Sequence, residues 1–171
     1  RLLDIIFSTT EALNKEGTEM DVEKHHKIAQ KCAEESLVLL ENDGVLPLNN
    51  KEKVAFIGKF IEEPRYQGAG SSVVNPHKLD RVLDEVKKYD LEYVGYEPGF
   101  ELKNKINKGL IKKACKLADK ADVVVVFAGL DNVTEAEGID RSNLLLPKGQ
   151  LALIDELLKL NKKIVVCLSC G

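Results

Sequence analysis

Short apolar runs of strand length alternate with longer segments of helical periodicity along most of this chain. The strands are expected at Val54–Ile57, Leu91–Tyr96, Asp122–Ala128 and Lys163–Leu168. Three intervening segments carry apolar residues three or four positions apart, as amphipathic helices do: Leu79–Tyr89, Lys103–Ala121 and Pro147–Leu160. Strands that alternate with helices of this length predict βαβ units and a parallel sheet covered on both faces. The predicted fold class is α/β, a three-layer sandwich with a mostly parallel sheet of the Rossmann or flavodoxin type.

The two ends of the chain depart from this alternation. Residues 1 to 18 begin with a short apolar segment and then become polar, so we interpret them as a connecting segment. A helix is expected from Val22 to Leu40, because Asp21 is a plausible N-cap and the apolar residues that follow recur at i, i+4 spacing. The chain stops at Gly171, where a fifth unit would begin, so we expect the domain to be incomplete at its C-terminus.

Composition narrows the class of protein. With 171 residues, of which 44% are hydrophobic, the chain is long enough to form one domain with a sizeable core. Its net charge is −3, and lysines and arginines are interspersed with acids, which argues against nucleic-acid binding. The longest apolar runs have the length of strands, so no segment is expected to span a membrane.

The four cysteines are far apart or close to the end of the last strand: Cys32, Cys115, Cys167 and Cys170. The last two have C-x-x-C spacing, but a redox motif of this kind opens a helix, and here the chain ends one residue later. Two cysteines need two further ligands to form a zinc site, and the three histidines show no matching spacing. We therefore expect reduced cysteines, no metal, and a cytoplasmic protein.

The most informative segment follows a strand of four consecutive valines, Val123–Val126. A continuous apolar strand is buried on both faces, and ligands of open parallel sheets bind outside the carboxyl ends of such strands. The segment after it, Phe127–Arg141, is rich in carboxylates and ends in Glu135-Ala136-Glu137-Gly138-Ile139-Asp140-Arg141. Glu135 or Glu137 can act as a general acid if burial or a neighbouring charge raises its pKa.

The end of the same loop carries an acid next to a base. Asp140 and Arg141 are expected to form an ion pair that orders the loop, and Arg141 is also available to orient a substrate hydroxyl or carboxylate. The alternative for the whole segment is a solvated acidic turn without a function.

A second loop, Gly68-Ala69-Gly70-Ser71-Ser72, follows the first predicted strand. Its glycines let the backbone approach a ligand, and its serines provide hydroxyl donors. A dinucleotide fingerprint has a third glycine and begins directly after the strand. Here the first glycine of the loop comes ten residues after Gly58, so a sugar-contacting or structural loop is favoured over a nucleotide site.

Several motifs occur in order along nearly the whole chain. They are His25-His26, Ala33-x-x-Ser36-x-Val38-Leu39-Leu40-x-Asn42-Asp43-Gly44-x-Leu46-Pro47-Leu48, Val54-Ala55-Phe56-Ile57-Gly58, Gly68-Ala69-Gly70-Ser71-Ser72, Ala121-Asp122-Val123-Val124-Val125-Val126, Glu135-Ala136-Glu137-Gly138-Ile139-Asp140-Arg141, Leu146-Pro147 and Gln150. Their order and separations closely resemble glycoside hydrolase family 3.

This resemblance implies a TIM barrel followed by an α/β sandwich. Residues 1–21 then correspond to the linker that leaves the barrel, and residues 22–171 to an incomplete sandwich domain. It also implies retaining hydrolysis of terminal β-linked sugars, with β-glucosides favoured, by an Asp nucleophile on the barrel and a Glu acid/base on the sandwich. Because these two carboxyl groups must lie about 5–5.5 Å apart, both domains have to meet at the site.

The resemblance leaves two candidates for the acid/base. In some members the acid stands three residues before the loop glycine, which corresponds to Glu135; in others it directly precedes Gly-x-Asp-Arg, which corresponds to Glu137. The pattern Thr134-Glu135-x-x-Gly138 favours Glu135. The remaining residues that the resemblance places at the substrate pocket are Gly68, Gly70, Ser71, Ser72 and Arg141, with Asp140 in support.

The partners implied are a glycoside substrate and the barrel of the same protein, without a cofactor. Two other functions stay open at this point. One is a non-catalytic carbohydrate-binding or scaffold domain that shapes a site carried by the barrel, and the other is a nucleotide-binding module of the Rossmann type.

Overall fold

The computed structural model of this chain describes residues 1–17 and 19–170. Residues 18 and 171 lie outside this part, and they belong to the predicted linker and the predicted sandwich domain, respectively. The chain divides into two compact units, Arg1–Leu40 and Glu41–Gly171.

The first unit contains two helices, α1 (Leu2–Leu13) and α2 (Val22–Ser36). The predicted connecting segment therefore contains a helix, α1, that the sequence pattern did not indicate. Its hydroxyl residues fit a helix because each donates a hydrogen bond to a carbonyl one turn earlier; Thr10 Oγ1, for example, lies 2.8 Å from the carbonyl oxygen of Ile6.

Helix α2 begins as predicted, because Asp21 Oδ1 accepts a hydrogen bond of 2.9 Å from Lys24 N. It ends at Ser36, four residues before the predicted end, and Leu37 is extended with φ −71° and ψ 131°. Ser36 Oγ donates to the carbonyl of Ala33 at 2.8 Å and so satisfies one of the last carbonyls of the helix. The apolar pattern beyond Ser36 thus belongs to an extended segment.

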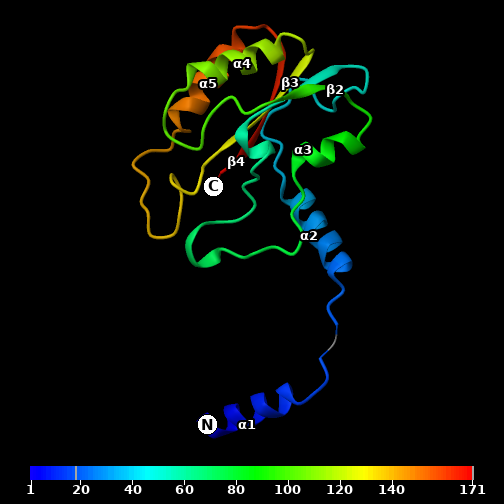
Figure 1. The fold of residues 1–171 in the computed structure, drawn as a ribbon, viewed down its shortest axis with the longest axis vertical. Helices are drawn as coiled ribbons and strands as arrows, with labels where there is room; N and C mark the ends of the chain where they lie inside the picture. The colour runs from blue at the N-terminus through cyan, green and yellow to red at the C-terminus, as the bar shows by residue number, and fades with distance from the viewer. Residues whose placement is uncertain (18, 171) are drawn as a thin grey trace. The chain divides into compact units, whose positions relative to one another are not determined.

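The second unit is built on a four-stranded parallel sheet in the order β2-β1-β3-β4 (Figure 1). The strands are β1 (Lys53–Ile57), β2 (Glu92–Glu97), β3 (Val123–Gly129) and β4 (Lys163–Ser169). All neighbouring pairs run parallel. The predicted strands and the parallel sheet are confirmed.

Helices connect these strands: α3 (Val82–Glu85), α4 (Lys108–Ala118) and α5 (Lys148–Leu158). Each is shorter than predicted. Helix α3 continues as a 3₁₀ turn over Val86–Lys88. Helix α4 begins only at Lys108, after its N-cap Asn107, whose side chain accepts hydrogen bonds from Gly109 N and Leu110 N. Within the described residues, no helix is both long and apolar enough to cross a membrane.

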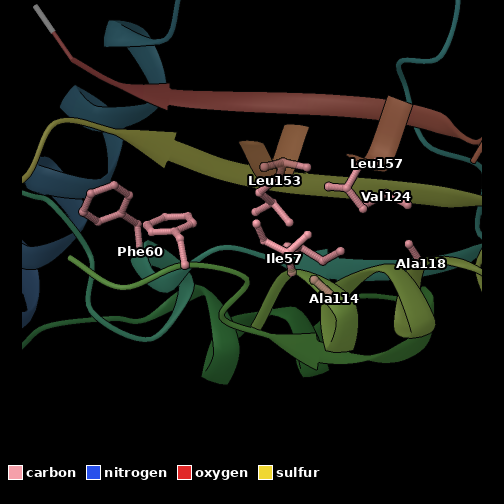
Figure 2. Packing of buried hydrophobic residues seen from close by; sticks show 10 residues of the cluster. Ile57, Phe60, Ala114, Ala118, Val124, Leu153 and Leu157 are labelled. Atoms are coloured by element: carbon pink, nitrogen blue, oxygen red, sulfur yellow. The ribbon is translucent and has the colours of Figure 1, made fainter. Parts of the chain in front are cut away.

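Successive valines of β3 point to opposite faces of the sheet and enter two separate cores. Val124 and Val126 pack with Leu153 and Leu157 of α5 and with the alanines of α4 (Figure 2). Val125 packs on the other face, with Val86 beside α3. The strand is therefore covered on both sides, as the continuous valine run predicted, and the unit has the three layers of an α/β sandwich.

Candidate functional site

The two loops singled out in the sequence leave neighbouring strands at the same edge of the sheet. From β1 the chain proceeds to β2 on one side, and from β3 it proceeds to β4 on the other. Loops that diverge in this way leave a crevice at the carboxyl ends of the strands, which is where ligands of such sheets bind. Gly58 allows the first loop to turn away, since its φ is +131° and a Cβ atom there would collide with the carbonyl of Phe127.

The end of β3 is held by a buried amide. Gln150 of α5 is only 2% exposed, and its side chain makes two hydrogen bonds of 2.9 Å to Gly129, one to the N–H and one to the carbonyl. The register of β1 with β3 ends at Ile57 and Val126, whereas Gly129 is still paired with Ser169 of β4. Gln150 thus replaces the missing neighbour at the last residue of the strand.

Asp131 shapes the beginning of the acidic loop. It is 4% exposed, and its Oδ1 accepts hydrogen bonds from Val133 N at 3.1 Å and Thr134 N at 2.7 Å. The Asp131 carbonyl accepts a further bond of 2.9 Å from Glu135 N. Sequence reasoning passed over Asp131, although an Asp two residues after a buried strand is a common turn former.

Arg65, in the loop after β1, connects the two loops and was also missed. Its Nη1 donates to the Leu130 carbonyl at 2.6 Å and its Nη2 to the Glu135 carbonyl at 3.2 Å. The same Nη2 lies 3.5 Å from Glu135 Oε2, with the side chains of Arg65 and Glu135 13% and 38% exposed. No spacing rule could have found this residue, because its partners lie 65 and 70 positions further along the chain.

Glu137 makes the second connection between the loops. Its Oε2 accepts hydrogen bonds from Ser71 N, at 2.7 Å, and from Ser71 Oγ. Gly70 makes room for this carboxylate: its φ is +85°, and a Cβ atom there would lie 2.7 Å from Glu137 Oε2. The side-chain and backbone hydrogen bonds of Ser71 hold the pKa of Glu137 below its usual value. Glu137 is therefore a hydrogen-bond acceptor here and poorly suited to donate a proton.

The other predicted residues of the first loop contact each other. A Cβ atom on Gly68 would lie 2.9 Å from Ser72 Oγ, and that hydroxyl donates to the Ala69 carbonyl at 3.4 Å. The structure thus brings Gly70 and Ser71 to the acidic loop, while Gly68 and Ser72 shape the turn that presents them.

The expected ion pair between Asp140 and Arg141 is not formed among the described residues. Asp140 is exposed and Arg141 is half-buried. The ion pair of this loop comes instead from Arg65. Arg141 Nε is buried without a hydrogen-bond partner in the described part of the chain, which leaves one donor available at this position.

The four cysteines are free, as expected from their separation in the sequence. Burial raises the pKa of the Cys167 thiol, which disfavours the reactive thiolate that a redox motif needs.

Residues 37–171 match the family model described as the glycosyl hydrolase family 3 C-terminal domain. The chain is 42% identical, over its full length, to thermostable beta-glucosidase B from Acetivibrio thermocellus and 36% identical, over 99%, to an exo-alpha-(1->6)-L-arabinopyranosidase from Bifidobacterium longum. Among solved structures, a GH3 beta-glucosidase from Bifidobacterium adolescentis matches 97% of the chain with a TM-score of 0.87 and 37% identity.

The chain spans 23% and 24% of the two curated relatives and 24% of the solved chain, that is, about a quarter of each. The predicted resemblance is confirmed, and the α/β sandwich described above corresponds to the matched domain. The chain belongs to glycosyl hydrolase family 3 and carries its C-terminal domain.

Proposed function

We propose that the protein to which this chain belongs is a retaining glycosidase for terminal β-linked sugars, β-glucosides foremost, and that Glu135 is its general acid and base. Two of the relatives named above are beta-glucosidases, which supports the substrate class. In this mechanism Glu135 protonates the leaving oxygen and then activates the water that releases the sugar.

The contrast between the two glutamates is the observation that carries this assignment. Ser71 donates two hydrogen bonds to Glu137 Oε2, from its N–H and its hydroxyl, and these hold the pKa of Glu137 below its usual value. Among the described residues, the half-buried Glu135 carboxyl group has one ion pair, 3.5 Å from Arg65 Nη2 to Oε2, which leaves Oε1 available to a substrate. Glu137 then serves to fasten the acidic loop to the glycine loop.

The rest of the active site lies outside this chain in the proposal. The nucleophile is an Asp of a TIM barrel in the same protein, about 5–5.5 Å from Glu135 when the site is assembled. Arg141 and the loop of Gly68, Gly70, Ser71 and Ser72 line the sugar pocket, with Asp140 beside it. The four free thiols favour a cytoplasmic location.

The second candidate is a non-catalytic domain that only shapes a site carried by the barrel. It is favoured by one observation: the acidic loop is held to the neighbouring loop by both of its glutamates, as a purely structural loop would be. The two candidates differ in whether Glu135 transfers a proton.

The test uses the whole protein and the matched variants Glu135→Ala and Glu137→Ala. Loss of the acid should lower kcat/KM by about 10²–10⁴-fold for methyl β-glucoside, whose leaving group needs protonation. The effect should be small for a dinitrophenyl β-glucoside, whose leaving group departs unaided, and azide should restore turnover because it attacks the glycosyl intermediate without a base.

We expect this signature for Glu135→Ala and near-normal leaving-group selectivity for Glu137→Ala. Azide rescue of Glu137→Ala alone would move the assignment to Glu137. If neither variant shows the signature, the loop is structural and the acid comes from the barrel.

A further inference from the structure

We infer that Arg65 is a positioning residue for the acid/base, which orients the Glu135 carboxyl group from the neighbouring loop. This inference rests on the proposed function, in which Glu135 transfers the proton. Arg65 would act through Glu135 without contacting the substrate.

The contacts of Arg65 converge on the segment that carries Glu135. Nη1 holds the carbonyl of Leu130, the first residue after β3, at 2.6 Å, and Nη2 holds the carbonyl of Glu135 at 3.2 Å. The second contact of Nη2, 3.5 Å from Glu135 Oε2, reaches the carboxylate itself. One guanidinium group therefore contacts both the backbone and the side chain of the proposed acid and can orient them together.

Arg65 is itself fixed in place. Its Nε donates to the Gln67 carbonyl at 3.1 Å, two residues along its own loop, and its side chain is 13% exposed. Gln67 is in turn tied to Val74, since its Oε1 accepts from Val74 N at 2.9 Å and its Nε2 donates to the Val74 carbonyl at 3.1 Å. The guanidinium is thus anchored by a loop that has its own internal bonds.

An arginine is needed at this position because three nitrogens of one planar group bind acceptors in three places. A lysine has a single ammonium group on a flexible stem and cannot present donors in this fork geometry. A residue that keeps a catalytic group in position affects the rate strongly, since a misplacement of about 1 Å can cost about 100-fold.

The test compares Arg65→Met with Arg81→Met in the whole protein. Arg81 is a matched control, because its guanidinium is exposed and forms an ion pair with Asp84 in the next turn, 2.7 Å away. We expect Arg65→Met to lower kcat/KM for methyl β-glucoside by about 100-fold and for a dinitrophenyl β-glucoside by less than about threefold. Arg81→Met should leave both values unchanged.

A double variant separates positioning from a purely structural role. In a Glu135→Ala background, Arg65→Met should cause no further loss with either substrate, because the group that it positions is already absent. An equal loss for both substrates, or a loss that adds to that of Glu135→Ala, would overturn the inference. Should Arg65→Met fail to fold, Arg65→Lys takes its place, since it keeps the charge and one donor nitrogen. The same selective loss is expected of Arg65→Lys, and the same two outcomes would overturn the inference.

The reference variant Glu135→Ala distinguishes the two levels of the proposal. If it shows the leaving-group signature while the Arg65 variants do not, only the role of Arg65 is wrong. If Glu135→Ala lacks the signature, the proposed function fails, and the positioning role fails with it.

Discussion

Replacing Gln150 with leucine should destabilise the second unit because it removes both hydrogen-bond partners of Gly129 at once. The Gln150 amide is 2% exposed, and its two bonds of 2.9 Å satisfy the N–H and the carbonyl of Gly129 beyond the point where β1 ends. Leucine has a similar size, so the change leaves little cavity and mainly uncovers two buried polar groups without partners.

The structure allows the magnitude to be worked out. Each buried backbone group that loses its partner costs about 1–3 kcal/mol. For the two groups together this is about 2–6 kcal/mol, of which burial of the leucine side chain offsets about 1.5–3 kcal/mol. We therefore expect the free energy of unfolding to fall by about 1–3 kcal/mol.

Urea denaturation of this chain, followed by circular dichroism, measures the loss as a shift of the midpoint by about 1–2 M. Gln30→Leu is the matched control, since Gln30 is exposed on α2 and its side chain, among the described residues, bonds only to Glu34 one turn away, an interaction worth about 0.2–0.5 kcal/mol. Hydrogen exchange at the Gly129 amide should become faster in Gln150→Leu. A midpoint shift no larger than that of Gln30→Leu would refute the reasoning.

Three further predictions follow from the site and the cysteines. This chain by itself should not hydrolyse aryl β-glucosides, because the proposed nucleophile lies outside it; turnover that persists in Glu135→Ala/Glu137→Ala chains would contradict the two-domain mechanism. Ser71→Ala should raise the pKa of the Glu137 carboxyl, measured by NMR titration, because it removes a donor that favours the ionised form. In the parent chain the depressed pKa contributes stability above the ordinary carboxyl pKa, and this contribution is lost as the pH falls through the folded-state value. Finally, iodoacetamide should modify the exposed Cys170 faster than Cys167, whose thiol pKa burial raises; equal rates would show that β4 does not shield Cys167.

The sequence by itself determined the strands, their parallel arrangement and the start of α2. A run of valines without polar interruption has no exposed face, so β3 had to lie in the middle of a covered sheet. Asp21 caps α2 through Lys24 N, three residues away, and a contact of this kind is visible in the local sequence. The order of motifs indicated the family for the same reason, since it depends only on residues and their separations.

Local pattern was less informative at the ends of helices and in α1. The hydroxyl residues of α1 looked like a polar connection, but in a helix they bond to their own preceding turn. The apolar periodicity that predicted α4 also extends to residues before its N-cap, Asn107. Residues next to a helix can share its apolar pattern without being helical, so the pattern does not fix the helix ends.

Only the tertiary structure shows what the two glutamates of the acidic loop contact. The local pattern Thr134-Glu135-x-x-Gly138 favours Glu135 by resemblance, but it does not show which groups surround either carboxylate. Their partners, Arg65 and Ser71, come from a loop at least 66 positions earlier, and the parallel sheet brings that loop alongside because β1 and β3 are neighbours. The charge and the donors that act on a carboxylate are set by such neighbours in space, and the order of the chain does not contain them.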